Sequence, residues 1–304
     1  MVACAYLFPG QGAQYVGMGK DLYERSSYAK EIFEKADGLL GFKLTTLCFE
    51  GPLETLTRTR NSQPAIFVTS AAALAALTRA SKNPYQPQAT CGLSLGEYTA
   101  LYAAGVLSFE EALRAVAARG RFMEEASEKT AGTLAALFGL NLQTVEALCE
   151  KTGTEVANLN CPDQIVVSGR LSDIERVMTL SKEAGAKRAI RLEVSGPFHS
   201  RFMKEAGEAL EKVLETLPLQ KPSIPFVSNV TAHFEEDPVQ IRGNLVRQVS
   251  QTVFWEESMR SLIGKGIRRF VEIGPGKVLT GLLRKIDPTV ACSHVETFQE
   301  IETL

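Results

Sequence analysis

The stretch ATCGLSLGEY, residues 89–98, decides the fold class of this chain. An apolar run that ends at Leu93 predicts a strand, and a helix rich in Ala and Leu is expected from Glu97 onward. Between them, residues 92–96 read Gly-x-Ser-x-Gly, the pattern of a tight strand-to-helix turn that lifts Ser94 out of a sheet edge. Glycine is expected on both sides of the serine because neighbouring side chains would clash there. The stretch therefore predicts an α/β protein with Ser94 as a candidate nucleophile.

Short apolar runs and helical patterns alternate along the rest of the chain, as they do in α/β proteins. Strands are expected at 3–8, 89–93, 134–138, 155–160, 164–168, 188–194, 226–228 and 269–273. The clearest helices, with apolar positions every three or four residues, are expected at 70–79, 109–126, 142–152, 172–184 and 200–216. Together they predict a large α/β-hydrolase-like lobe with a parallel sheet.

A small lobe is expected as an insertion into the large one. Between about Thr130 and Ser195 the order is strand, helix, strand, strand, helix, strand, which is the ferredoxin-like order. The predicted division is residues 1–129 and 196–304 for the large catalytic lobe and 130–195 for the small ferredoxin-like lobe. The cleft between the lobes is then the expected site.

Composition indicates an ordinary globular protein. The 304 residues are 45% hydrophobic and 22% charged, with a formal net charge of -2, so no nucleic-acid or anionic-membrane partner is expected. The apolar run at the amino terminus has no positive charges before it and no cleavage site after it, and no apolar stretch is long enough to span a bilayer. We therefore expect a cytoplasmic protein.

The cysteines give no sign of a metal site. Six of them lie far apart with no CxxC or Cys/His spacing, which suits reduced thiols and favours neither zinc nor a disulfide framework. No metal is expected.

A serine nucleophile needs a base at neutral pH, and the sequence offers three histidines. His199 follows Ser195-Gly196-Pro197-Phe198, where the chain returns from the small lobe to the large one, and so at the cleft edge. His233 and His294 are expected to be surface histidines. His199 is therefore the candidate base.

Two backbone N–H groups are candidates for an oxyanion hole. That of Leu95 follows the serine at a helix amino terminus, where it would face a developing negative charge. That of Gln11 lies in the turn Phe8-Pro9-Gly10-Gln11-Gly12 after the first strand, although a structural turn with a solvated Gln explains this segment equally well. A third turn, residues 274–277, lacks phosphate-loop spacing and is expected to be a tight connection.

Five motifs together resemble one family. They are FPGQG at 8–12, GLSLGEY at 92–98, AARGRFM at 117–123, GPFHS at 196–200 and EIGPGKVLTGL at 272–282. In this order and spacing they resemble the malonyl-CoA:acyl-carrier-protein transacylases of type II fatty-acid synthesis, over essentially the whole chain.

The resemblance implies a role for each matching residue. Ser94 would be the nucleophile and His199 the base, with the N–H groups of Gln11 and Leu95 as the oxyanion hole. Arg119 would pair with the malonyl carboxylate, whereas helical periodicity alone leaves it as a solvated flank residue beside Met123. The implied substrate-binding positions are Arg119, Met123, Asn160 and Gln248.

Two positions depart from the family pattern. The family orients its histidine through the backbone carbonyl of a glutamine in Gln-x-x-x-Pro-Val, which Gln248 to Val253 resembles with Thr252 in place of proline and Gln251 nearby. Most members also carry histidine before the nucleophile, where this chain has Leu93. An imidazole at that position is then not essential for activity, and we expect the change to alter packing near Ser94.

The expected activity is transfer of a malonyl group from coenzyme A to the phosphopantetheine thiol of acyl carrier protein, by a ping-pong route through a Ser94 acyl-enzyme. The partners implied are malonyl-CoA and acyl carrier protein, without any cofactor beyond the CoA substrate, and a monomer is expected. A serine esterase or thioesterase is the first alternative, in which water resolves the acyl-enzyme. A non-catalytic carrier-protein docking module is the second, and the joint presence of Ser94, His199, Gln11 and Arg119 argues against it.

Overall fold

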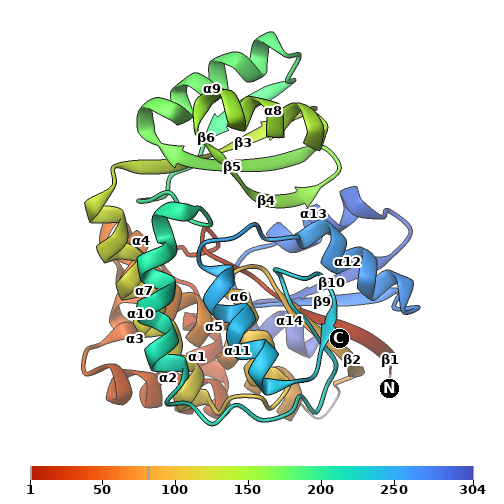
Figure 1. The fold of residues 1–304 in the computed structure, drawn as a ribbon. Coiled ribbons are helices and arrows are strands. Elements are labelled where there is room, and N and C mark those ends of the chain that lie inside the picture. The colour runs from red at the N-terminus through yellow and green to blue at the C-terminus, as the bar shows by residue number, and fades with distance from the viewer. Residues whose placement is uncertain (1, 81–82, 304) are drawn as a thin grey trace.

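The computed structural model describes residues 2–80 and 83–303, which form an α/β structure with two separate sheets (Figure 1). A six-stranded sheet, called the large sheet here, lies among most of the helices. A four-stranded sheet, the small sheet, lies above it in the view of Figure 1 and carries two helices on its far side.

The large sheet is mostly parallel. Its strands are β1 (Val2–Phe8), β2 (Tyr85–Gly92), β7 (Phe226–Val227), β8 (Phe234–Glu235), β9 (Arg269–Ile273) and β10 (Ala291–Val295). They are ordered β10-β9-β1-β2-β7-β8, and every pair is parallel except β7 with β8. Strand β1, in the middle of the sheet, is an almost continuous apolar run because helices cover both faces of the sheet.

Helices on one side of the large sheet pack around α5. The helices in this part of the chain are α1 (Lys20–Arg25), α2 (Ser27–Leu40), α3 (Leu44–Glu50), α4 (Leu53–Thr57), α5 (Thr59–Arg79), α6 (Gly96–Ala103) and α7 (Phe109–Lys129). Helix α5 is buried almost all round, between α2 and α7. The second half of α5 is mostly small or apolar on every face, which is why it shows little amphipathic pattern.

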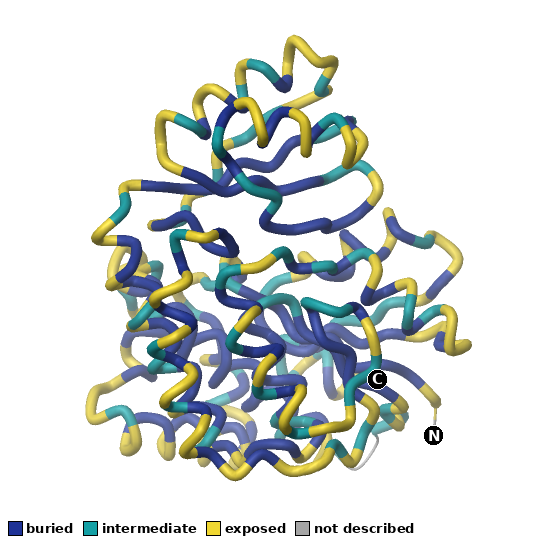
Figure 2. The backbone as a smooth tube through the Cα atoms, viewed as in Figure 1, coloured by how far each residue is buried: buried dark blue, intermediate teal, exposed yellow. Residues whose placement is uncertain are grey.

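The remaining helices follow the small sheet in sequence. They are the single 3₁₀ turn Arg201–Met203, α10 (Lys204–Leu214), α11 (Pro238–Gln248), α12 (Trp255–Gly264), α13 (Val278–Ile286) and α14 (Phe298–Glu302). Helices α12 and α13 cover the other face of the large sheet, where Trp255, Met259 and Leu283 are buried with Leu7 and Phe270. The large sheet is thus the middle layer between two layers of helices (Figure 2).

The small sheet is antiparallel throughout. It contains β3 (Gly132–Phe138), β4 (Glu155–Cys161), β5 (Gln164–Arg170) and β6 (Arg188–Arg191) in the order β4-β5-β3-β6, with α8 (Leu142–Thr152) and α9 (Leu171–Glu183) packed on one face. Val145, Val167 and Val177 belong to its own apolar core. The other face looks toward the large sheet (Figure 1).

Strand β4, at one edge of the small sheet, is bonded to the segment that follows α11. The Leu159 N–H donates to the Val253 carbonyl over 3.0 Å, and the Val253 N–H donates to the Ala157 carbonyl over 2.8 Å. The Thr252 hydroxyl donates to the Val156 carbonyl over 2.7 Å. These bonds attach the edge of the small sheet to the connection between α11 and α12.

Most expected elements are confirmed, with differences at their ends. Helix 142–152 agrees residue for residue, whereas α5 begins eleven residues before the expected 70–79. The first half of α5 has no apolar helical pattern in the sequence because it contains polar side chains and Pro64. Thr59, Ser62 and Gln63 are nevertheless buried. The expected helix 200–216 begins with a 3₁₀ turn, and β6 ends at Arg191 instead of residue 194. Strands β8 and β10 were not predicted, because neither is a continuous apolar run.

Within residues 2–80 and 83–303, no helix has both the length and the apolar character needed to cross a bilayer.

Candidate active site

Ser94 lies in the turn between β2 and α6, at the carboxyl end of a central strand of the large sheet. Its backbone has a φ of 52°, a left-handed conformation that side chains rarely adopt. A Cβ on Gly92 would lie 2.0 Å from the backbone of Gly96, and one on Gly96 would lie 2.1 Å from the Phe8 carbonyl oxygen. The two glycines are therefore required by close backbone packing, as the Gly-x-Ser-x-Gly pattern predicted.

The Ser94 hydroxyl is paired with His199. Its Oγ lies 2.8 Å from His199 Nε2, and the other ring nitrogen, Nδ1, lies 2.7 Å from the backbone carbonyl oxygen of Gln248. Because that carbonyl can only accept, Nδ1 carries the proton and Nε2 is left to accept one from Ser94. Of the two glutamines that the sequence left open, Gln248 supplies this carbonyl.

His199 is held as a neutral imidazole. It is 5% exposed, and its backbone φ is 56°. Burial, with the nearby charge of Arg119 as a second cause, lowers the pKa of His199 to about 4. The unprotonated ring that a general base needs is thus the stable form at neutral pH.

Arg119 points into the site and is only 1% exposed. The prediction of a solvated helix arginine from periodicity is therefore wrong. Its Nη2 donates to Ser94 Oγ over 3.0 Å and to Gln248 Oε1 over 2.9 Å, while Nη1 donates to Gln63 Oε1 over 2.7 Å. Its Nε has no partner among the described residues. A buried guanidinium on the apolar side of α7 cannot be recognised by helical periodicity, because periodicity assigns charges to the solvated face.

Three polar residues behind Ser94 were missed by the sequence analysis. Asn229 Oδ1 accepts from the Ser94 N–H over 2.6 Å, and its Nδ2 donates to the Gly92 carbonyl over 2.8 Å. Gln63 orients Arg119, and Glu97 accepts hydrogen bonds from Asn229 and Gln248. Their sequence neighbours carry no pattern that marks them, although an acid directly after Gly-x-Ser-x-Gly was a signal that could have been used for Glu97.

The two expected oxyanion donors lie beside Ser94. The Leu95 N–H, at the start of α6, and the Gln11 N–H, in the turn after β1, have no protein acceptor within the described part of the chain. The Gln11 side chain is held by a hydrogen bond in which its Nε2 donates to the Thr59 hydroxyl over 3.2 Å. Neither N–H group is thus used by a hydrogen bond within the described protein, and their role as an oxyanion hole stays a prediction.

A cleft of about 520 Å³ opens between the two sheets in front of Ser94. Gln11, Ser94, Arg119, Met123, Asn160 and His199 all line it, whereas Gln248 and Leu95 lie behind its wall. Asn160 is 8% exposed and its Oδ1 has no partner among the residues described. Leu93 also lines the cleft, next to the turn that contains Gly10. Three of the four expected substrate-binding residues, Arg119, Met123 and Asn160, thus share one cavity, and Gln248 does not line it.

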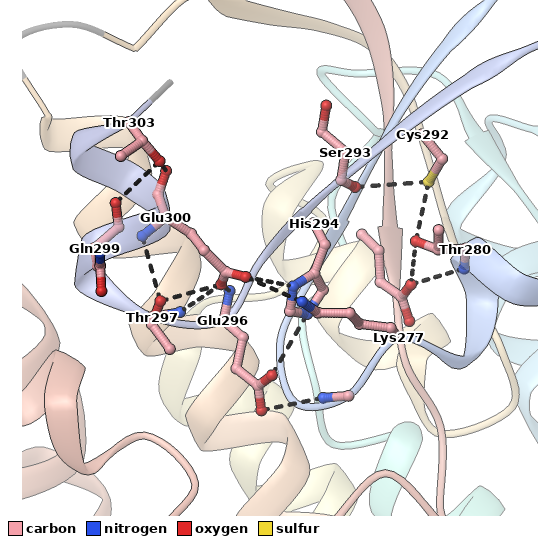
Figure 3. A network of polar contacts seen from close by, with 12 residues as sticks. Lys277, Thr280, Cys292, Ser293, His294, Glu296, Thr297, Gln299, Glu300 and Thr303 are labelled. Atoms are coloured by element: carbon pink, nitrogen blue, oxygen red, sulfur yellow. Dashed lines mark hydrogen bonds and ion pairs between the residues drawn. The ribbon is translucent and has the colours of Figure 1, made fainter.

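The other two histidines lie outside this cleft. His233 is exposed, as expected. The expectation of a surface histidine is wrong for His294, whose side chain is 7% exposed and lies between Glu296 and Glu300 (Figure 3). Its Nδ1 lies 3.1 Å from Glu300 Oε1. This network ties β10 to α14 and explains the burial of His294 without a role in the cleft.

The turn at residues 274–277 is closed by side chains of the protein. Glu272 accepts from the N–H groups of Leu279 and Thr280 at the start of α13, and Glu296 accepts from the Gly276 N–H. The N–H groups that would hold a phosphate are thus occupied by carboxylates, which agrees with the expected tight connection.

No cluster of three or more metal-ligating side chains occurs in the ranges 2–80 and 83–303. The cysteines in these ranges are unpaired, and burial raises the pKa of most of them, for example that of Cys48 to about 12. The expectation of no metal stays a prediction.

The chain is similar to known acyltransferases over nearly its whole length. Residues 5–293 match the model of the acyl transferase domain family. The chain is 45% identical to the malonyl CoA-acyl carrier protein transacylase of Bacillus subtilis strain 168, over 100% of this chain and 98% of that protein. The chain belongs to the malonyl CoA-acyl carrier protein transacylase family. It is an acyltransferase.

Other family members agree with this assignment. The transacylase of Staphylococcus aureus strain MRSA252 is 41% identical over 99% of this chain and 98% of its own length. The crystal structure of the acyl-carrier-protein S-malonyltransferase of Bartonella henselae superposes with a TM-score of 0.94, at 39% identity, and covers 100% of this chain and 98% of that one.

One solved relative is a complex. It is described as a type II PKS acyl-carrier protein with its malonyl-transacylase, and matches with a TM-score of 0.94 at 36% identity over 98% of this chain and 97% of that one. The resemblance predicted from five sequence motifs is thereby confirmed at the level of the family.

Proposed function

We propose that this chain moves a malonyl group from malonyl-CoA to the phosphopantetheine thiol of acyl carrier protein through an acyl-enzyme on Ser94. The observation that carries the proposal is the constellation at the cleft floor. The Ser94 hydroxyl is within 3.0 Å of both a neutral imidazole and a buried guanidinium. Family membership supports the same activity.

In the first half-reaction Ser94 Oγ attacks the thioester carbonyl while its proton passes to His199 Nε2. The carbonyl oxygen gains the negative charge, which the N–H groups of Gln11 and Leu95 would stabilise. As the carbonyl reforms, the C–S bond breaks and the imidazolium returns the proton to the leaving CoA sulfur. The Gln248 carbonyl keeps Nδ1–H oriented and so stabilises the charged ring in between.

In the second half-reaction the carrier-protein thiol takes the place of CoA. Its proton passes to His199, its sulfur attacks the Ser94 ester, and Ser94 Oγ leaves with that proton. Thioester, ester and thioester are close in free energy, so exclusion of water matters more than driving force, and a cleft between two sheets suits this need.

Arg119 gives the proposed preference for malonyl. A guanidinium can hold a carboxylate through two parallel hydrogen bonds and stays charged at working pH. In the free protein its acceptors are the neutral groups Gln63, Gln248 and Ser94. A malonyl carboxylate would add a negatively charged group in direct contact with the guanidinium. Met123 and Asn160, which line the same cavity, would contact the acyl group or the pantetheine arm.

Exposed basic side chains at the junction of the two sheets would attract an acidic carrier protein. Arg188 of β6 and Lys285 of α13 both lie over the Phe138 ring, at 5.2 and 5.8 Å from its centre. Lys187 and Arg191 lie on or beside the same strand, and Arg284 precedes Lys285. Charge complementarity of this kind speeds encounter.

We also propose that the chain consists of two lobes of known fold types. The order β4-β5-β3-β6 supports a ferredoxin-like small lobe at residues 130–195, and the turn at Ser94 supports an α/β-hydrolase-like large lobe at 1–129 and 196–304. Three further expectations stay predictions: that the protein is a monomer, that it needs no cofactor, and that it is located in the cytoplasm.

A hydrolase with the same residues would resolve the acyl-enzyme with water. The test is to isolate the malonyl-enzyme and follow its decay with and without carrier protein bearing phosphopantetheine. We expect slow decay in buffer and rapid transfer to the carrier thiol. Equal decay rates in the two samples would favour the hydrolase and contradict the proposal.

A further inference from the structure

Glu97 is a buried carboxylic acid in the first turn of α6, three residues after Ser94. It is 1% exposed. One carboxylate oxygen, Oε1, accepts from the Asn229 N–H over 2.8 Å, and the other, Oε2, accepts from Gln248 Nε2. Burying a carboxylate without such partners is costly, so both bonds are part of what keeps it there.

Gln248 is fixed in one orientation by its neighbours. The Arg119 guanidinium can only donate, and it donates to Gln248 Oε1. The Nε2 group of Gln248 must therefore face hydrogen-bond acceptors. Those acceptors are the Ser94 carbonyl, at 2.8 Å, and Glu97. The backbone carbonyl of this same glutamine holds His199 Nδ1. Glu97 therefore restrains the residue on which the position of the imidazole depends.

Asn229 connects Glu97 to the Ser94 turn. Its backbone is held by Glu97, and its side chain accepts from the Ser94 N–H and donates to the Gly92 carbonyl. These two side-chain bonds close the turn in which Ser94 has positive φ. Glu97 thus supports the position of the serine as well as that of the histidine.

We propose that Glu97 is a positioning residue for the acyl transfer described above, holding His199 through Gln248 and Ser94 through Asn229. The inference rests on the proposed function. Glu97 contacts neither substrate nor reacting atoms, so its effect is on the geometry of the Ser94–His199 pair. A displacement of that pair by about 1 Å can cost about 100-fold in rate.

The charge of Glu97 makes this role sensitive to pH. Burial raises the pKa of Glu97 to about 7. The titratable or charged groups that face it are Arg119 of α7, Cys91 of β2 and Tyr98 of its own helix. Above pH 7 the carboxylate accepts both bonds, whereas below it one oxygen carries a proton and one contact is lost. Acyl transfer should therefore fall as the pH drops through about 7, while His199 is still neutral.

The test is Glu97→Gln, with kcat and KM for malonyl transfer measured from about pH 5 to 8. The side-chain NH₂ of the new glutamine can only donate, so it would face the N–H donor of either Asn229 or Gln248, and one hydrogen bond would be lost. We expect kcat to fall about 10- to 100-fold with KM unchanged, and the step in rate near pH 7 to disappear. If Glu97→Gln had the kcat of the wild type and kept the change in rate near pH 7, the proposal would be overturned.

Asp37→Asn is the matched control. Asp37 is a buried carboxylate on α2 that accepts two hydrogen bonds from Thr45, outside the site. This variant should lose thermal stability but keep the wild-type kcat and pH profile. If Glu97→Gln does not fold, Glu97→Asp keeps the charge but is too short to reach both partners, and wild-type kcat in that variant would equally count against the role.

A second measurement tests the role of Glu97 without assuming malonyl transfer. The rate at which phenylmethanesulfonyl fluoride modifies Ser94 reports on the Ser94–His199 pair without any acyl substrate. We expect Glu97→Gln to slow this modification and to remove its step near pH 7. An unchanged modification rate and profile would contradict the role of Glu97 whatever the natural substrate is.

Discussion

Ser94 and His199 share an unusual backbone conformation, with φ values of 52° and 56°. For residues other than glycine this conformation costs about 1 to 2 kcal/mol each, so it persists only where surrounding contacts impose it. The Ser94 N–H donates to Asn229 Oδ1, and Gln248 Nε2 donates to the Ser94 carbonyl. The His199 N–H donates to the Val249 carbonyl over 3.3 Å. Of the three non-glycine residues with positive φ in the described ranges, Ser94 and His199 are the two that we propose to react, and Ala232 is the third.

The pH dependence of Ser94 acylation should show a limb that belongs to His199. Because the pKa of His199 is lowered to about 4, its neutral form, the active one, persists as the pH falls from 8 to about 5. Acylation should then vanish with a midpoint near pH 4, below the step assigned to Glu97. Rapid-quench measurement of the malonyl-enzyme in Glu97→Gln isolates this limb, and a midpoint near 6.5 would mean that the imidazole is not desolvated.

Arg119→Ala should change the acyl preference. Removing one partner of a buried, hydrogen-bonded charge pair costs about 2 to 5 kcal/mol, so malonyl transfer should fall roughly 30-fold or more while acetyl transfer gains in relative terms. The ratio of acylation rates with malonyl-CoA and acetyl-CoA, in wild type and variant, measures the effect. If the ratio does not move, another group recognises the carboxylate.

At the scale of single elements, the turn from β2 to α6 depends on glycine at residue 96. A methyl group there would lie 2.1 Å from the Phe8 carbonyl oxygen, whereas one on Gly243 of α11 would meet nothing within 4 Å. Gly96→Ala should therefore destabilise the fold by about 3 kcal/mol or more, and Gly243→Ala should be neutral or stabilise it by up to about 1 kcal/mol. Urea unfolding of the two variants gives the comparison, and equal stabilities would argue against the packing described.

Sequence reasoning succeeded for elements with a strong local pattern and failed where tertiary contacts decide. The Gly-x-Ser-x-Gly turn and helix 142–152 are defined by neighbouring residues. The first half of α5 was missed because Thr59, Ser62 and Gln63 look solvated but are buried. Arg119 was recognised through the family motif and not through periodicity, because its burial depends on Gln63 and Gln248, distant in sequence.

At the scale of the whole molecule, the site exists because two sheets meet. Ser94 comes from the large sheet, Asn160 from β4 of the small one, and His199 from the chain that returns between them. Next to His199, Arg201 is bonded to Glu155 of β4 and to the Gly153 carbonyl. The connection that bears the histidine is thus anchored on the small sheet, which explains how a residue on a loop keeps a 2.8 Å contact with Ser94.

Charge reversal at the junction of the sheets should affect one half-reaction only. Arg188→Glu and Lys285→Glu should slow transfer from the malonyl-enzyme to carrier protein, more so at low salt, and leave acylation by malonyl-CoA unchanged. Lys212→Glu on α10, an exposed position that lines no part of the cleft, is the control. Equal losses in both half-reactions would speak against a docking role.

The proposed mechanism requires that a malonyl group resides on Ser94 during turnover. The most direct test is to incubate wild type and Ser94→Ala with malonyl-CoA, quench in acid, and measure the intact mass and the modified peptide. We predict one malonyl group per wild-type chain, on the peptide that contains Ser94, and none on the variant. A malonyl adduct on Ser94→Ala, or on a different peptide of the wild type, would contradict the account.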